Sequence, residues 1–322
     1  MKALFSTILA LALAFSISAC DDKSGAAPEP QNPSGKPSAG TPDRTLIRIM
    51  SFNIRTGTSD KNKANARDKR KVGVYEMINV ENPLIVGIQE CRMVQRDDLE
   101  KNCPGYKGFG LVRDNPKAKT GETCSIIYDE AQCSIEKWGS FWLNEKNPDE
   151  VHTGWDAEYN RIATWAVVKV KANGKRFFFI NTHLDNSGAV ARREGLNLVM
   201  AKFKELNTEN LPQVLTGDFN VAKPSDVFTV CEQTMKDVRD NAPTTDKIGT
   251  FNNWGSSSKV IDYIFESGFK ILEYRTVNDT WKGVKYISDH YPICALMRFE
   301  KYSTSIVKSK AADQCIDQPL LS

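Results

Sequence analysis

Histidine is scarce in this chain, and the cysteines show no metal-binding spacing. Only 3 of the 322 residues are His, and no Cys-x-x-Cys pair occurs, which argues against a zinc site of that kind. The formal net charge of +3 is too small for a protein that coats nucleic acid, although a nuclease with a locally basic surface remains open. Beyond the N-terminal segment, no run is long and apolar enough to span a bilayer.

The one long apolar run lies at the N-terminus and predicts a targeting segment. Lys2 precedes the largely apolar residues 3–17, a run shorter than the roughly 20 residues that a spanning helix needs. The following Ile17-Ser18-Ala19-Cys20 resembles the bacterial lipoprotein box, in which the Cys becomes the lipidated first residue. We therefore expect a lipoprotein signal peptide over residues 1–19 and lipidation of Cys20. The alternative is an ordinary secretory signal, cut near Ala19.

Proline, glycine and serine are frequent in residues 20–43, which hold 5 of the 14 prolines. Such a segment cannot bury a core and predicts a disordered tether, whose reach is at most on the order of 70 Å. Residues 44–300 are then expected to form one domain, followed by a tail over residues 301–322. The expected location is the bacterial cell envelope, lipid-anchored to a membrane and facing the periplasm or the cell surface. No protein partner is predicted.

Seven cysteines remain besides Cys20, and an odd number leaves at least one thiol unpaired. Disulfides are permitted outside the cytoplasm. We expect most of these cysteines to be buried, unreactive thiols. Cys315 in the polar tail is the candidate for a bridge back to the domain.

Alternating and continuous apolar segments predict many strands and few helices. Many strands with few helices between them indicate packed sheets rather than a doubly wound parallel sheet. We therefore predict an α+β fold: a four-layer α/β sandwich with two packed, mainly antiparallel β-sheets flanked by helices. The expected strands are 45–53, 84–89, 125–128, 138–143, 162–170, 176–182, 215–218, 260–265, 269–277 and 292–299, and the expected helices are 64–79, 188–206 and 225–230.

Carboxylates, amides and two of the three histidines stand at the ends of several predicted strands. Phosphoester hydrolysis requires positioned charge around the phosphoryl oxygens, an activated water and a stabilised leaving oxygen. A divalent cation supplies much of this charge, and oxygen ligands without a Cys/His cluster suit Mg²⁺ first, and Mn²⁺ or Ca²⁺ next. The residues in question are Asn53, Glu90, His183, Asp218, Asn220, Asp262, Asp289 and His290.

Together these segments resemble the endonuclease/exonuclease/phosphatase superfamily, whose fold is deoxyribonuclease-I-like. The resemblance covers roughly residues 44–300, and it rests on eight short motifs in family order, each weak alone. The motifs are Ser51-Phe52-Asn53-Ile54-Arg55, Ile88-Gln89-Glu90, Gly121-Glu122 leading into Ile126-Ile127-Tyr128, Arg161-Ile162-Ala163-Thr164-Trp165, Asn181-Thr182-His183-Leu184-Asp185, Gly217-Asp218-Phe219-Asn220, Ile261-Asp262-Tyr263-Ile264-Phe265 and Ser288-Asp289-His290-Tyr291-Pro292.

The resemblance implies a metal site and a water-activating pair. Glu90 would be the principal metal ligand, with Asn53 and Asp289 completing or orienting the site. His290 would act at the attacking water, and Asp262 would hold it in the required tautomer.

The resemblance also implies a set of residues around the phosphate. His183 would bind or protonate a phosphoryl oxygen, with Glu122 as its carboxylate partner. Asp218 and Asn220 would align the nucleophile and the phosphate. Arg161 would hold the phosphate through its planar guanidinium.

Several of these residues also have a structural explanation. Asn53 could cap a strand end, and residues 218–220 could form a turn, since Asp and Asn favour turns. Arg161 could form a surface ion pair. His183 and His290 could be hydrogen-bonded histidines at a sheet edge.

Other residues fall outside the central motifs or have two explanations. Glu122 could equally be structural. His152 matches no motif and is expected in a loop. The aromatic residues within 138–142 are expected in the core rather than on a base-stacking platform. Trp254 is expected at the rim of the substrate site.

The leading hypothesis is an extracytoplasmic, lipid-anchored, Mg²⁺-dependent phosphoesterase. Its substrate stays open between a nucleic acid, a phospholipid head group and an inositol phosphate. One alternative is a catalytically silent binding lipoprotein on the same fold. Another is a glycan-associated module of the envelope.

Overall fold

The computed structural model describes residues 45–57 and 62–300. The chain divides into two units, Met1–Pro42 and Asp43–Ser322, and all described residues belong to the second. The predicted signal peptide, Cys20, the tether, the tail and Cys315 lie outside the described residues. None of the helices in the described part of the chain is long and apolar enough to cross a membrane.

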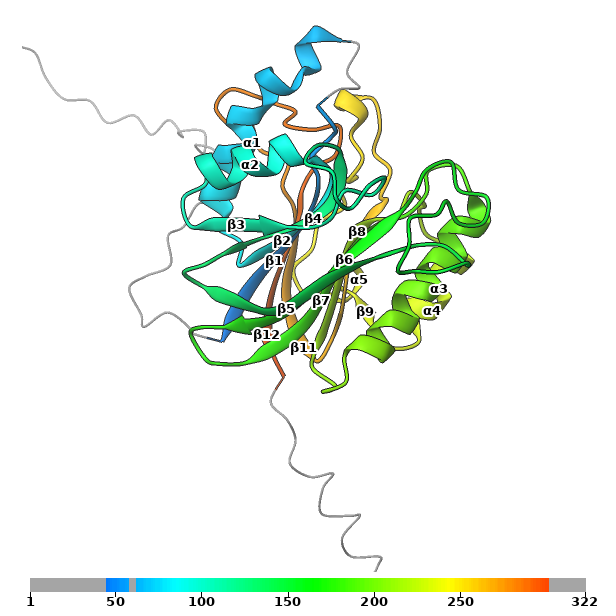
Figure 1. The fold of residues 1–322 in the computed structure, drawn as a ribbon. Coiled ribbons are helices and arrows are strands. Elements are labelled where there is room, and N and C mark those ends of the chain that lie inside the picture. Colours follow the sequence, from blue (N-terminus) through cyan, green and yellow to red (C-terminus); the bar gives the residue numbers. More distant parts are fainter. Residues whose placement is uncertain (1–44, 58–61, 301–322) are drawn as a thin grey trace, which may run out of the picture. The chain divides into compact units, whose positions relative to one another are not determined.

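Two six-stranded sheets form the body of the domain (Figure 1). Both are mixed but mainly antiparallel, because only the pairs β1–β2 and β7–β8 are parallel. The first sheet has the order β11 (Phe269–Thr276), β12 (Ile293–Phe299), β1 (Leu46–Asn53), β2 (Ile85–Arg92), β4 (Glu122–Asp129), β3 (Tyr106–Phe109). The second has the order β5 (Cys133–Trp142), β6 (Ile162–Val170), β7 (Arg176–His183), β8 (Gln213–Asp218), β10 (Asp262–Ser267), β9 (Lys236–Asp237).

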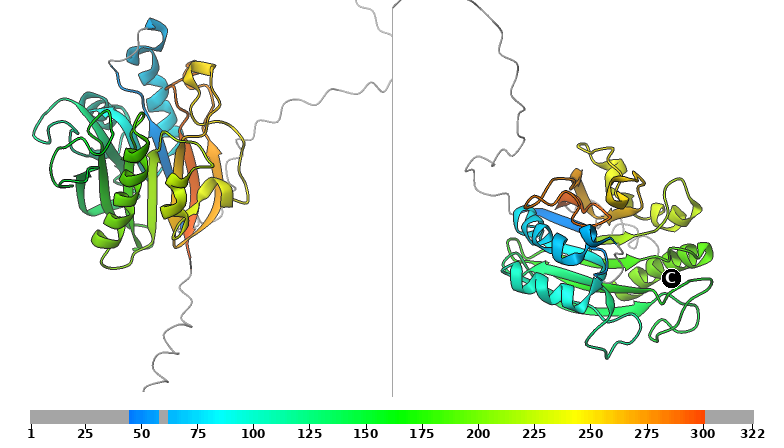
Figure 2. Two further views of the ribbon diagram at one scale, coloured as in Figure 1. Left: turned by 90° about the vertical axis from the view of Figure 1, so that its right-hand side faces the viewer. Right: turned by 90° about the horizontal axis from the view of Figure 1, so that it is seen from above.

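Helices cover the outer face of each sheet, on opposite sides of the pair (Figures 1 and 2). Apolar side chains of α1 pack with those of β1 and β2, and those of α3 pack with β7 and β8. The predicted four-layer sandwich is thus confirmed. The helices are α1 (Arg67–Glu81), α2 (Met93–Asn102), α3 (Ala189–Leu206), α4 (Thr229–Glu232) and α5 (Val238–Asn241), with short 3₁₀ turns η1 (Lys63–Asn65), η2 (Asp226–Phe228) and η3 (Asn253–Gly255).

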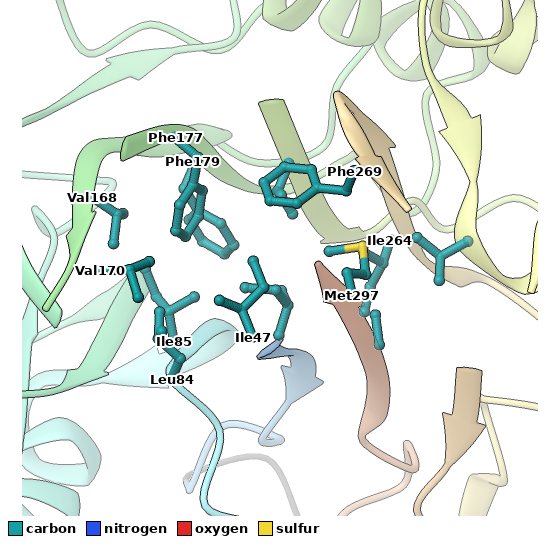
Figure 3. Packing of buried hydrophobic residues seen from close by; sticks show 14 of the residues in the cluster. Ile47, Leu84, Ile85, Val168, Val170, Phe177, Phe179, Ile264, Phe269 and Met297 are labelled. Carbon is teal, nitrogen blue, oxygen red and sulfur yellow. The ribbon is translucent and has the colours of Figure 1, made fainter. Parts of the chain in front are cut away.

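Between the sheets lies a fully buried apolar core (Figure 3). Phe177 and Phe179 of the second sheet are completely buried in it. The ring of Phe177 lies edge-on to that of Phe269 in the first sheet, with centroids 5.8 Å apart. Aromatic burial of this kind supplies much of the free energy that holds two sheets together.

Towards the strand ends that carry the predicted site, the inter-sheet contact becomes polar. The Oδ1 of buried Asn181 accepts hydrogen bonds from Gln89 Nε2 at 2.7 Å and from Thr216 Oγ1 at 3.2 Å. A Cβ placed on Gly87 would overlap Thr216 Oγ1 and lie 2.5 Å from Asn181 Oδ1. Glycine is therefore required at residue 87 for the sheets to approach so closely.

The six cysteines of the described residues are all free and buried, as expected for most of them: Cys91, Cys103, Cys124, Cys133, Cys231 and Cys294. The aromatic residues within 138–142 differ in their burial. Phe141 and Trp142 are buried as predicted. Trp138, however, is 45% exposed on the edge strand β5, so the prediction of a core position was wrong for it.

Replacing Phe179 by Ala should lower the free energy of unfolding by about 3–5 kcal/mol, because it opens a cavity between the sheets. Urea unfolding followed by circular dichroism measures this change. Val80, an exposed valine of α1, provides the control, and its change to Ala should stay within about 0.5 kcal/mol. Equal losses for the two variants would contradict the assignment of the core.

Candidate active site

Strand register brings three of the predicted residues together at one edge of the second sheet. β7 and β8 are parallel, so their ends meet, and His183 is paired with Asp218. β10 runs antiparallel to β8 and begins at the same edge, where Asp262 is paired with Asp218. Residues up to 79 positions apart in the sequence thus become lateral neighbours.

The first sheet contributes Asn53 and Glu90 through a distortion of β2. Asn53 ends β1 beside Gln89. The register of β2 with β4 shifts between Ile88 and Cys91, and Glu90 has a positive φ of 55°. Such a β-bulge changes the direction in which a side chain points. The left-handed backbone conformation of Glu90 costs roughly 1–3 kcal/mol. Here it leaves the Glu90 carboxylate within 3.2 Å of Asn53 Nδ2.

Asn53 connects the two sheets. Its Nδ2 donates to Glu90 Oε1 and, at 3.0 Å, to Asp218 Oδ2 of the second sheet. Burial alone would raise the pKa of Glu90. The backbone N–H of Thr56 and the charge of Arg55 outweigh burial and hold this pKa below its usual value. Glu90 is therefore a carboxylate at neutral pH.

Glu90 and Asp289 face a common position that suits a cation. Arg55 Nη1 lies 3.8 Å from Glu90 Oε2 and 3.4 Å from Asp289 Oδ2. Burial raises the pKa of Asp289, and the negative charge of Glu90 adds to this effect. Two carboxylates that share one guanidinium provide hard oxygen donors of the kind that Mg²⁺ prefers, so the residues present fit a divalent cation.

His290 forms a buried pair with Asp262. Its Nδ1 donates to the Asp262 carboxylate at 2.9 and 3.1 Å. Its Nε2 consequently points to Asp218, whose Oδ2 is 3.7 Å away. Burial would lower the pKa of His290, but the charges of Asp262 and Asp218 outweigh it and raise this pKa well above its usual value. The buried Asp218 also has a raised pKa, because of desolvation first and the nearby Asp262 second.

His183 has a different environment. The Asn220 amide donates to its Nε2 at 3.0 Å, and Asp218 Oδ2 is 3.4 Å from the same nitrogen. Burial lowers the pKa of His183 well below its usual value, and the positive charges of Arg161 and Arg113 lower it further. The two histidines of the site therefore differ: His183 is neutral, and His290 holds its proton.

Glu122 and Arg161 line the site, but with partners that the sequence did not predict. Glu122 accepts a hydrogen bond from Arg113, and His183 Nδ1 has no hydrogen-bonding partner among residues 45–57 and 62–300. The expected direct pair of Glu122 with His183 is thus absent, because the guanidinium offers the stronger, charged donor. Arg161 Nε donates to Asp185 Oδ2 at 3.0 Å.

A single cavity of about 860 Å³ collects these groups, within the size range of small-molecule sites. Asn53 and Asp262 do not line it; both are buried, and they contact the lining residues Glu90, Asp218 and His290. The lining comprises Arg55, Thr56, Glu90, Arg113, Glu122, Tyr159, Arg161, His183, Asn186, Asp218, Asn220, Val221, Ala222, Phe251, Asn253, Lys259, Ile261, Asp289 and His290.

A second group of side chains could also hold a metal ion. Asp218, Asp262 and His290 are all buried, and each has a potential ligand atom within 4.8 Å of those of the others. Two sets of metal ligands are therefore compatible with the geometry: this cluster and the predicted set around Glu90 and Asp289.

Several lining residues were missed by sequence reasoning. Arg55 belongs to a quoted motif and could have been found there. Arg113, Tyr159 and Lys259 lie in connections between strands, where no motif or periodicity marks them. Conversely, Trp254 does not line the cavity, so its predicted place at the rim was wrong. Instead, the guanidinium of Arg70 lies over its ring, at 5.4 Å from the centroid.

His152 lies outside the cavity, as its lack of a motif predicted. It stands in the connection between β5 and β6, where its Nε2 is 3.2 Å from Glu150 Oε2.

Known proteins share this sequence pattern and fold. Residues 50–290 match the Endonuclease/Exonuclease/phosphatase family. A mannosyl-6-phosphatase from Bacteroides thetaiotaomicron is 34% identical, with 79% of this chain and all of that chain covered and a TM-score of 0.74. An endonuclease/exonuclease/phosphatase from Bacteroides vulgatus is 35% identical, with coverage of 80% and 100% and the same TM-score. An uncharacterised protein of Acanthamoeba polyphaga mimivirus is 24% identical over 272 residues, which cover 77% of this chain and 98% of that protein.

Changing Glu90 to Gln or Asp289 to Asn should weaken Mg²⁺ or Mn²⁺ binding by at least about tenfold, since even hydrogen-bonding partners of metal ligands are worth that much. Isothermal titration calorimetry of the purified domain measures the affinity. Asp262→Asn is the matched comparison and should bind the cation nearly as well as the unmodified protein. The opposite pattern would assign the cation to the cluster of Asp218, Asp262 and His290.

Proposed function

We propose that this chain, which belongs to the Endonuclease/Exonuclease/phosphatase family, is a divalent-metal-dependent phosphoesterase that removes phosphate from a phosphomonoester outside the cytoplasm. The observation that carries the proposal is the convergence of Glu90, Asp289, His183, Asp218 and His290 on one cavity. Each of these side chains is of a type that in-line phosphoryl transfer requires. Two buried histidines with opposite pKa shifts are expected of a working site rather than of a catalytically silent one.

Glu90 and Asp289 are the residues that would hold the cation. Bound there, Mg²⁺ would neutralise charge on the phosphoryl oxygens. Asn53 keeps the Glu90 carboxylate in place through its amide. Arg55 neutralises part of the negative charge of both carboxylates.

The water is activated by Asp218 and the His290–Asp262 pair. Asp262 fixes the imidazole through Nδ1, so that the Nε2–H of His290 faces Asp218 and the cavity. Asp218, with its raised pKa, is a better proton acceptor than an ordinary carboxylate. His290 donates a hydrogen bond and stabilises negative charge at the reacting centre.

Polar side chains in fixed positions line the proposed phosphate side of the cavity. Asn220 holds His183 by its Nε2, and the same amide nitrogen also donates to the Leu184 carbonyl at 3.0 Å. The side chain of Arg161 is 5% exposed, and Asp185 fixes its guanidinium. A buried, fixed guanidinium loses little side-chain entropy when it binds an oxyanion.

A carbohydrate phosphomonoester is the proposed substrate class. Its support is the similarity over the whole length of the mannosyl-6-phosphatase and a cavity whose lining mixes amides, arginines and the ring of Tyr159. The low net charge of the chain gives no corresponding support for a long nucleic acid, whose binding depends on neutralising many phosphates.

In the presence of Mg²⁺ the protein should release inorganic phosphate from mannose 6-phosphate, and EDTA should abolish this release. A phosphate-release assay over a panel with glucose 6-phosphate, bis-p-nitrophenyl phosphate, DNA, RNA, sphingomyelin and an inositol phosphate ranks the substrates. Turnover that persists in EDTA would remove the metal from the mechanism. Activity on none of the panel would favour a binding protein on the same fold.

The matched control compares a histidine that lines the cavity with one that lies outside it. His290→Ala should lower kcat by a factor of at least about 10² without unfolding the domain. His152→Ala, in a loop outside the cavity, should leave kcat unchanged. Near-normal turnover by the His290 variant would exclude this residue from the reaction.

The proposed location depends on Cys20 in its lipoprotein-like box. In a bacterial host the full chain should fractionate with membranes and partition into detergent, because an attached lipid anchor adds apolar chains to its N-terminus. Cys20→Ser should abolish incorporation of a labelled fatty acid into the protein, while Cys315→Ser should not. Soluble behaviour of the unmodified chain, or unchanged fatty-acid incorporation in the Cys20 variant, would contradict lipid anchoring.

A further inference from the structure

Two arginines from separate connections stack on one tyrosine at the wall of the cavity. Arg113 lies between β3 and β4, whereas Tyr159 and Arg161 precede β6. The guanidinium carbon of Arg113 lies 5.2 Å from the centroid of the Tyr159 ring, and that of Arg161 lies 5.6 Å from it. Cation–π contacts of this kind fix the planes of both guanidinium groups.

Each arginine also forms a hydrogen bond with a carboxylate. Glu122 accepts a hydrogen bond from Arg113 Nη1, and Asp185 accepts one from Arg161 Nε. Arg161 Nη2 also donates to Asn186 Oδ1 at 2.5 Å. The two guanidinium groups are therefore pre-organised, which lowers the entropy cost of binding an anion.

Each arginine still has one amino group available. In the described part of the chain, neither Arg113 Nη2 nor Arg161 Nη1 has a hydrogen-bonding partner, and neither is enclosed by protein. Both residues line the same cavity as His183 and Asp218. Two fixed donors thus remain for an oxyanion beside the proposed reaction centre.

We propose that Arg113, which belongs to none of the sequence motifs, acts with Arg161 as a two-arginine clamp that makes the site selective for phosphomonoesters over phosphodiesters. This proposal rests on the proposed function and names the residue that decides the substrate class. A phosphomonoester carries a charge of about −2 at neutral pH and has three terminal oxygens. A diester has a single charge and one terminal oxygen fewer, so it gains less from a second guanidinium.

The experiment compares two substrates in the full chain with Mg²⁺. Arg113→Met should lower kcat/KM for p-nitrophenyl phosphate by about 10- to 100-fold, the usual worth of a charge-assisted hydrogen bond. For bis-p-nitrophenyl phosphate, kcat/KM should change by less than about threefold. The ratio of the two values is the measured quantity. An unchanged ratio, whether both rates fall or neither does, would overturn the clamp.

Three further variants control for folding and charge. Arg113→Met combined with Glu122→Gln avoids leaving a partly buried carboxylate unpaired and should show the same decrease in the ratio. Arg113→Lys keeps the positive charge but lacks the planar guanidinium. Its ratio of kcat/KM for the monoester to that for the diester should therefore lie between those of the unmodified chain and Arg113→Met. Arg176→Met removes an arginine that is paired with Glu136 and Glu209 away from the cavity, and should leave the ratio unchanged.

Binding of inorganic phosphate separates this proposal from the proposed function. In calorimetry with Mg²⁺, Arg113→Met should weaken phosphate binding by at least about tenfold. If the unmodified chain cleaves neither ester, the proposed function fails, and the phosphate titration still decides the clamp. Equal phosphate affinity in the variant and in the unmodified chain would refute the role of Arg113.

Discussion

The site depends on the close approach of the two sheets near Gly87. A side chain at this position would overlap Thr216 and Asn181, so the polar contact between Gln89, Asn181 and Thr216 forms only because residue 87 has no Cβ. The same approach lets the Asn53 amide reach Asp218 across the sheets at 3.0 Å. Glu90 and Asp289 belong to the first sheet and its connections, whereas Asp218 and Asp262, which contact His290, belong to the second. A shift between the sheets would therefore separate Glu90 and Asp289 from Asp218.

Backbone strain is concentrated at the same edge. Arg55, Glu90 and Asn220 all have positive φ values, of 60°, 55° and 52°. Left-handed backbone is costly for a side chain such as Glu and less so for Asn. The surrounding structure holds these conformations, since Thr56 donates its N–H to Glu90 Oε2 at 2.9 Å and Asn220 donates its N–H to Asp218 Oδ1 at 2.9 Å. Strain held in this way is expected where side chains must converge for chemistry rather than for packing.

The sequence predicted the layers and the central residues because each has a local signal. Strand ends followed by Asp, Asn or His marked the site, and apolar periodicity marked α3. Sequence reasoning failed for residues whose contact partners are distant in the sequence and are marked by no motif or periodicity. α2 has only two buried residues, Gln95 and Leu99, so it shows no apolar stripe. Glu122 binds Arg113 rather than His183 because the fold brings that guanidinium within reach. The exposed edge of β5, which leaves Trp138 open, follows from sheet order and not from composition.

The charged side chains of the cavity form two regions, one rich in acids and one that contains two arginines. On one side, Glu90 and Asp289 share Arg55, and Asp218 and Asp262 share His290, so acids outnumber the cations between them. This region favours a divalent cation, and binding of the cation would stabilise the folded state by mass action.

On the other side, Arg113 and Arg161 keep one free donor each although carboxylates pair with them. His183 lies on the side of the arginines, where burial and then their positive charge hold its pKa well below its usual value. The His290 imidazole lies among acids and remains charged. The two histidines therefore stand in different electrostatic environments, which suits the separate roles that the proposed function gives them.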